Sequence, residues 1–128
     1  MNQEYKKWFN KAENDLQNIV NNLTSEIIPC DTVCFHSQQV AEKYLKGYLT
    51  GQNVLIEKTH NLLILLEMSK KIDISFEQIK SELITLNDYA VTSRYPDFIN
   101  ELTIDDANEA YQCALKVKEF ILIKIKTK

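Results

Sequence analysis

The chain is poor in the residues that interrupt regular structure, since it contains only two glycines and two prolines in 128 residues. So little backbone punctuation argues against a turn-rich β-sandwich and favours long helices. The sequence also lacks strand-type alternation, internal repeats and low-complexity stretches. No apolar run approaches the roughly 20 residues of a membrane span, and the amino-terminal segment has no apolar signal core. These absences predict a soluble all-α protein without a membrane segment.

Cysteine, histidine and positive charge are also in short supply. The three cysteines, Cys30, Cys34 and Cys113, form no zinc-type pairs and are expected to be free thiols in a reducing cytoplasm. Neither histidine has a second ligand at metal-binding spacing, and two glycines cannot build a phosphate loop. A net charge of −3 argues against coating nucleic acid by bulk electrostatics. We therefore expect no metal and no cofactor.

The first half of the chain contains two amphipathic helical patterns. Apolar residues in steps of three and four predict one helix over about 3–23 and another over about 32–50. Asp31 is the expected N-cap of the second helix, and Gly51 is its expected end. Phe35 points away from the apolar stripe of this helix, which suggests that a second subunit covers it.

Three further helices follow. Thr59 is expected to cap a short helix that is apolar nearly all round, and Ser75 with Gln78 resembles a capping box for the next helix. Thr103, followed by acidic residues, is the expected cap of the last one. The predicted fold is all-α, an antiparallel up-and-down bundle of four long helices plus one short helix. We expect residues 1–128 to form a single domain.

The only arginine, Arg94, stands between a helical pattern and Pro96. A guanidinium group presents a rigid fork of donors that grips a carboxylate or phosphate with two hydrogen bonds. Tyr95 adds a stacking face and a hydroxyl group, and Asp97 could orient the arginine. This corner is suited to recognising an anion or a nucleotide. An equally simple explanation is structural, with Arg94 paired to Asp97 or Glu101.

His36 and His60 are the only histidines. His36 shares one shoulder of the second helix with Lys43, beside the apolar stripe. A histidine in such a place is either hydrogen-bonded as a structural residue or turned toward a ligand. His60 lies at the start of the short helix, where bonding a neighbouring helix or loop would explain it.

Three segments resemble HEPN domains, named for higher eukaryote and prokaryote nucleotide-binding proteins. Residues 35–46, FHSQQVAEKYLK, are similar to the FHxQQAxEKxLK helix of that family. Residues 59–62, THNL, match its THDL helix start with asparagine in place of aspartate, and residues 89–97 are similar to its Y…xRYPD segment. The helix order and length agree as well, so the resemblance covers nearly the whole chain.

The resemblance implies a four- or five-helix bundle that commonly forms a homodimer. Many small bacterial members are paired with a minimal nucleotidyltransferase as toxin and antitoxin, and active members are metal-independent ribonucleases with an Arg-x(4–6)-His signature. After Arg94, that histidine is expected at residue 99, 100 or 101, where this chain has Ile99, Asn100 and Glu101. Asparagine cannot shuttle a proton, so the ribonuclease signature is incomplete.

The leading hypothesis is a cytoplasmic HEPN-type protein that binds a nucleotide or RNA phosphate and regulates a minimal nucleotidyltransferase in a toxin–antitoxin-like pair. The predicted ligand-binding residues are Arg94, Tyr95, Asp97, His36 and Lys43. One alternative is a metal-independent endoribonuclease toxin with Arg94 and His36 as candidate catalytic residues. Another is a non-catalytic dimerisation scaffold.

Overall fold

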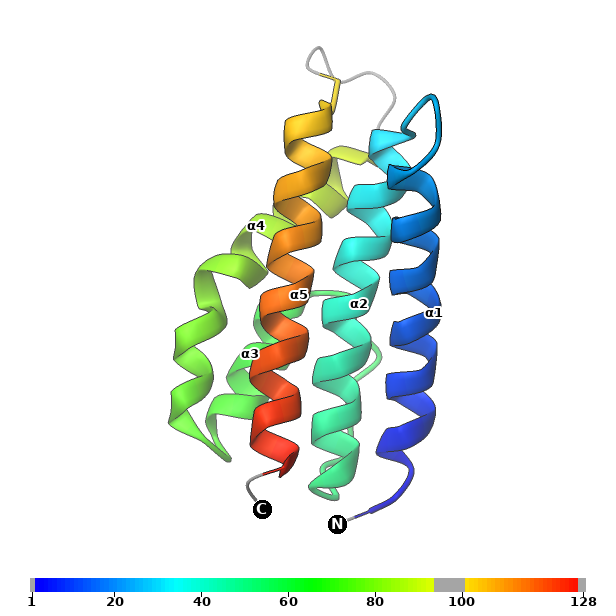
Figure 1. Ribbon diagram of the computed structural model, residues 1–128. Helices are drawn as coiled ribbons and strands as arrows, with labels where there is room; N and C mark the ends of the chain where they lie inside the picture. Colours follow the sequence, from blue (N-terminus) through cyan, green and yellow to red (C-terminus); the bar gives the residue numbers. More distant parts are fainter. Residues whose placement is uncertain (1, 94–100, 127–128) are drawn as a thin grey trace.

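The computed structural model describes residues 2–93 and 101–126, which form helices and no strands. The elements are α1 (Tyr5–Leu23), α2 (Cys30–Gly51), α3 (Leu62–Lys70), the 3₁₀ helix η1 (Ile74–Ile79), α4 (Lys80–Ser93) and α5 (Ile104–Lys126). Figure 1 shows α1, α2, α4 and α5 running up and down along the bundle, and α1 begins at the end where α5 stops. The prediction of an all-α bundle is confirmed. None of the described helices is both long and apolar enough to cross a membrane.

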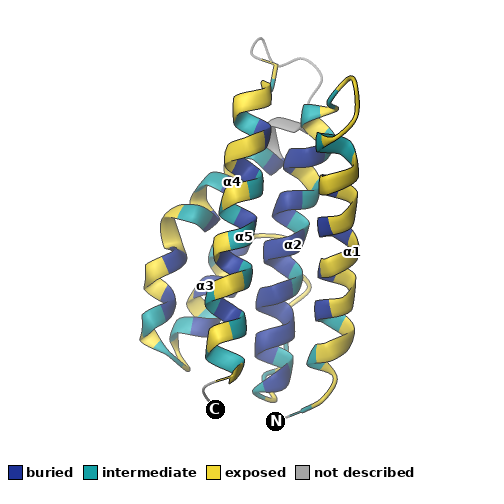
Figure 2. Ribbon diagram, in the orientation of Figure 1, coloured by how far each residue is buried: buried dark blue, intermediate teal, exposed yellow. Residues whose placement is uncertain are grey.

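α2 is the central helix, because it packs against α1, α3, α4 and α5. Figure 2 shows it buried along most of its length, whereas α1 is exposed on its outer side. The close approach of α1 depends on Gly47, since a Cβ atom there would lie 2.6 Å from Cε1 of Phe9. The ring of Phe9 therefore occupies the space that a side chain at position 47 would need.

α5 presents small residues to the core. Ala107, Ala110 and Ala114 are fully buried, and short side chains let neighbouring helices come close. The predicted cap of α5 is also confirmed: Thr103 Oγ1 accepts the main-chain N–H of Asp106, and Asp106 Oδ2 accepts that of Thr103. This reciprocal pair satisfies two donors that a helix start leaves free.

Two predicted caps were each wrong by two residues. α2 begins earlier than expected, with Pro29 at its N-cap position, so Asp31 lies in the first turn, where its charge favours the positive end of the helix. α3 is capped by Asn61, which accepts the N–H of Leu63, rather than by Thr59. The side chain of Asn61 therefore caps α3, whereas Pro29 at the start of α2 makes no side-chain capping hydrogen bond.

The segment before α4 also differs from the prediction. Asp73, not Ser75, caps it, because Asp73 Oδ1 accepts both the N–H and the hydroxyl of Ser75. The first turns are the 3₁₀ helix η1 rather than part of the α-helix. Although α3 is apolar nearly all round, it is not fully enclosed, since the side that carries Ile64 is open and this residue is 39% exposed.

Candidate functional site

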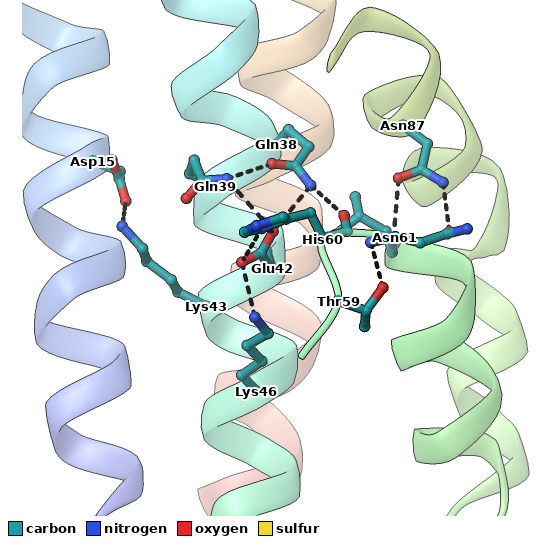
Figure 3. Close-up of polar contacts among 11 residues, drawn as sticks. Asp15, Gln38, Gln39, Glu42, Lys43, Lys46, Thr59, His60, Asn61 and Asn87 are labelled. Atoms are coloured by element: carbon teal, nitrogen blue, oxygen red, sulfur yellow. Dashed lines mark hydrogen bonds and ion pairs between the residues drawn. The ribbon is translucent and has the colours of Figure 1, made fainter. Parts of the chain in front are cut away.

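Two carboxylates, one in α1 and one in α2, each pair with one histidine and one lysine. Asp15 lies against His36 and Lys43, and this group is called the Asp15 triplet below. Glu42 lies against His60 and Lys46, and this group is called the Glu42 triplet. Figure 3 shows Asp15 reaching Lys43 from α1, and Glu42 between Lys46 and His60. The triplets have the same chemistry, but they join different parts of the bundle.

The Asp15 triplet joins α1 to α2. His36 Nδ1 lies 2.7 Å from one oxygen of Asp15, and Lys43 Nζ donates to the other oxygen at 2.5 Å. His36 and Lys43 are two helical turns apart, so they lie on the same side of α2. Asp15 itself is only 7% exposed, and a buried carboxylate has to be paired in this way. The His36 and Lys43 side chains remain one-fifth exposed.

The contact with Asp15 determines how His36 can act. A carboxylate accepts but does not donate, so the proton of a neutral His36 is held on Nδ1. Among the described residues, Nε2 of His36 has no hydrogen-bond partner. The imidazole is therefore oriented with one nitrogen available to a ligand. The ring of Phe35 meets the imidazole edge-on, with the ring centroids 5.3 Å apart, and Phe35 as a residue is 38% exposed.

The Glu42 triplet ties α2 to the start of α3. Glu42 is 3% exposed and accepts a hydrogen bond from Lys46 Nζ at 3.0 Å, with His60 Nδ1 at the same distance. Gln38 adds a bond to Glu42 and another, at 2.8 Å, to the main-chain carbonyl of His60. Gln39 completes the cluster by donating to the side-chain oxygen of Gln38. All members lie in the two motifs that resemble the HEPN family.

The THNL segment has a structural explanation. The side chain of Asn61 caps α3, and the main-chain N–H of Asn61 donates a hydrogen bond to Thr59 Oγ1. Asn87 of α4 accepts the N–H of Leu62 and donates to Asn61 Oδ1. Figure 3 shows these contacts linking the two helices beside the Glu42 triplet. Asparagine at position 61 supplies the same acceptor that an aspartate would.

Tyr89, at the start of the third motif, joins α4 to α5. Its hydroxyl group lies 2.5 Å from Glu109 Oε1 and 3.1 Å from Asp106 Oδ1. Burial, followed by the hydrogen bonds to these two carboxylates, raises the pKa of the phenol. Tyr89 is therefore a protonated donor at neutral pH, and its contacts hold the end of α4 against the start of α5.

The cysteines carry no chemistry that the geometry supports. The described residues include no group of three or more His, Cys, Asp or Glu arranged to hold a metal ion. All three cysteines are free thiols, and burial raises the pKa of Cys34 to about 12 and that of Cys113 to about 11. Thiols with such pKa values are poor nucleophiles at neutral pH.

The structure brings together two of the predicted ligand-binding residues, His36 and Lys43, at Asp15. Arg94, Tyr95 and Asp97 lie outside the described residues. Asp15 was not among the site residues predicted from the sequence, although one signal pointed to it.

That signal is the position of Asp15 on the apolar stripe of α1, between Ala12 and Ile19. A charged residue there must meet a partner from another helix. Glu42 was also missed. Its spacing of four residues from both Gln38 and Lys46 places all three on one side of α2.

Comparisons with known proteins agree with this architecture. The family model described as HEPN domain matches residues 5–125. The crystal structure of TT1696 from Thermus thermophilus is similar with a TM-score of 0.80 and 26% identity, covering 97% of this chain and 99% of that one. The crystal structure of ST0689, an archaeal HEPN homologue, has a TM-score of 0.75 and 28% identity, covering 94% and 97%. The search of curated proteins found no match.

Proposed function

Because the chain belongs to the HEPN domain family, we propose that it binds a nucleotide or RNA phosphate and regulates a minimal nucleotidyltransferase. The observation that supports this proposal is the meeting of His36 and Lys43 at one partly exposed position between α1 and α2. Such a pair offers an anion the ammonium group of Lys43 and, when the ring is protonated, Nε2–H of His36, both from a rigid helix. Arg94, Tyr95 and Asp97 would complete the site in this proposal.

The chemistry of the Asp15 triplet suits a phosphate group. An ammonium group has three donors, and Lys43 gives one of them to Asp15. A protonated His36 would offer Nε2–H while Nδ1 stays on Asp15. A phosphate oxygen could then take charge-assisted bonds from both side chains.

Fluorescence anisotropy with a short labelled single-stranded RNA, and competition by ATP, tests the binding. We expect Lys43→Met and His36→Gln to weaken RNA binding several-fold. Lys7→Met is the matched control for charge, because Lys7 is an exposed lysine paired with Glu4 near the start of α1. Equal weakening by Lys7→Met and Lys43→Met would contradict a site at the Asp15 triplet.

The partner needs a separate test. If the neighbouring reading frame encodes a minimal nucleotidyltransferase, the two proteins should copurify when they are expressed together. The nucleotidyltransferase activity should also change when this chain is added. Copurification without any change in that activity would contradict the regulatory role.

A second candidate function is a metal-independent endoribonuclease in the cytoplasm. The geometry that favours it is the contact of His36 Nδ1 with Asp15, which leaves Nε2 to exchange a proton. In this reaction Nε2 takes the 2′-hydroxyl proton, the 2′-oxygen bonds to phosphorus, and the bond from phosphorus to the 5′-oxygen breaks. The leaving 5′-oxygen receives a proton from water. Products with a 2′,3′-cyclic phosphate are therefore expected.

Incubation of RNA with the protein in EDTA tests this candidate. Cleavage should be lost in His36→Gln and kept in His60→Gln. His60→Gln is the matched control, because Nδ1 of His60 also contacts a carboxylate, that of Glu42. The absence of cleavage by several independent preparations would remove the enzyme from consideration.

A third candidate is a dimerisation scaffold. It is supported by Phe35, a residue of the central helix that is 38% exposed. Light scattering should then show a homodimer that Phe35→Ser converts to a monomer. A monomeric wild type at micromolar concentration would contradict this role.

A further inference from the structure

Both oxygens of Asp15 are occupied by His36 and Lys43, the two side chains that form the proposed ligand site. We propose that Asp15 is a built-in counter-ion that competes with an external phosphate group for His36 and Lys43 and so limits the affinity of the site. This inference rests on the proposed function and describes how that site is regulated. In effect, the carboxylate of α1 occupies the place of the ligand when no ligand is bound.

The charges of the triplet support this role. Asp15 contributes one negative charge and Lys43 one positive charge, so with a neutral His36 the triplet has no net charge. A phosphate group that approaches Lys43 meets an ammonium group already paired at 2.5 Å and a nearby carboxylate that repels it. Removing the charge of Asp15 leaves a net positive site at the same position.

The contacts of Asp15 also suit a replaceable partner. Within residues 2–93 and 101–126, its carboxylate accepts hydrogen bonds only from the side chains of His36 and Lys43, and none from the main chain. Lys43 has a long flexible stem and its side chain is 21% exposed, so its ammonium group can turn from Asp15 to a ligand without moving a helix. The buried carboxylate then stays paired with Nδ1 of His36.

The carboxylate of the Glu42 triplet, in contrast to Asp15, is tied into the structure around it. Glu42 is 3% exposed, and its partner Gln38 also bonds the main chain at His60. An external anion could not replace Glu42 without loosening the start of α3. Each triplet contains a carboxylate, a histidine and a lysine, but only the Asp15 triplet is built so that its carboxylate can be exchanged.

The experiment measures binding of the labelled single-stranded RNA, and of ATP, to the wild type and to Asp15→Asn at several salt concentrations. We expect Asp15→Asn to bind about fivefold more tightly at low salt, since a unit charge near the ligand has about this effect at a partly exposed position. The salt dependence should become steeper, by about 0.7 in the logarithmic slope for each added phosphate contact.

The matched control is Glu13→Gln. Glu13 precedes Asp15 by two residues on α1 and loses the same charge, but it is held by Lys118 and Tyr44. Its substitution should leave RNA binding nearly unchanged. The double variant Asp15→Asn/Lys43→Met should lose the gain, because the freed ammonium group is its source. Asp15→Ser, with folding checked by circular dichroism, repeats the test should the asparagine variant fold poorly.

The outcomes separate this inference from the proposed function. Tighter binding by Asp15→Asn but not by Glu13→Gln supports the counter-ion role. Weaker or unchanged binding by Asp15→Asn, with a wild type that binds, overturns the counter-ion role and leaves the proposed function intact. Equal gains in both variants also overturn it, because they would reflect net charge alone. If neither the wild type nor any Asp15 variant binds RNA or ATP, both proposals fail.

Discussion

Gln38 Nε2 donates a hydrogen bond to the main-chain carbonyl of His60 at 2.8 Å, across 22 residues of chain. A buried side chain of α2 thereby holds the connector just before α3. The same amide also reaches Glu42, whose carboxylate lies against the ring of His60. The start of α3 is therefore fixed to α2 through both its main chain and a side chain.

The first prediction concerns the charge of Glu42. In Glu42→Gln, Lys46 keeps its burial, with 8% of the residue exposed, but loses its counter-ion. An unpaired buried charge is strongly unfavourable, so we expect the free energy of unfolding to fall by about 3 kcal/mol in urea denaturation. Glu67→Gln is the control, because Glu67 pairs with Lys70 at the surface and its loss should cost less than about 1 kcal/mol. Equal losses in the two variants would show that the burial of Glu42 is unimportant.

Most of the helical framework could be predicted from the sequence. The apolar stripes of α1 and α5 follow from side-chain spacing, which burial confirms at residues such as Ala12 and Ala110. The capping residues were harder to predict, because Asp73 and Ser75 both carry a suitable oxygen and are only two residues apart. The choice between them depends on the backbone angles at each residue, and the residue type does not determine those angles.

The candidate site was only partly predictable for a different reason. His36 and Lys43 share a helix, so their spacing places them together. Asp15 lies 21 residues from His36 and 28 from Lys43 in sequence, on another helix. Which residue of α1 faces a given residue of α2 depends on how the two helices are aligned along their axes. That alignment is set partly by the contact between Phe9 and Gly47.

The second prediction concerns the cap of α3. Asn61→Ala removes the acceptor for Leu63 N–H and for Asn87 Nδ2, so we expect a loss of about 1–2 kcal/mol in stability. Asn61→Asp keeps the acceptor and adds a negative charge at the helix start. This substitution should leave the stability unchanged or raise it by up to about 1 kcal/mol. Thermal unfolding of both variants checks the pair. A destabilised Asn61→Asp protein would mean that the amide group is needed.

The third prediction concerns the packing of α1 on α2. Gly47→Ala should destabilise the protein by about 1–3 kcal/mol, because the new Cβ lies 2.6 Å from the ring of Phe9. That ring is confined by Tyr5 and Tyr44, with centroids 5.2 and 4.6 Å away. The higher helix propensity of alanine offsets at most about 1 kcal/mol.

The double variant Gly47→Ala/Phe9→Leu gives the control for this packing, since a smaller side chain at position 9 makes room for the methyl group. Its stability should exceed the value expected from adding the two single effects. Simple additivity in urea denaturation would show that the ring and position 47 do not interfere with each other.

The fourth prediction concerns acid stability. The hydroxyl of Ser75, then Lys124 and the main-chain N–H of Ser75, lower the pKa of Asp73 from 3.8 to about 2. Because the pKa is lower in the folded state, the ionised carboxylate stabilises the fold above the unfolded value and this contribution is lost as the pH falls from about 4 to 2. Asp73→Asn should therefore be less stable than the wild type near neutral pH, and the difference should shrink over that interval.

Urea denaturation of both proteins at several pH values measures this difference. Glu57→Gln is a suitable control, because Glu57 is exposed in the connector before α3 and its substitution should leave the profile unchanged. A gap between Asp73→Asn and the wild type that stays constant down to about pH 2 would contradict the assignment. The stabilisation would then come from the shape of the cap rather than from the charge that Asp73 places beside Lys124 of α5.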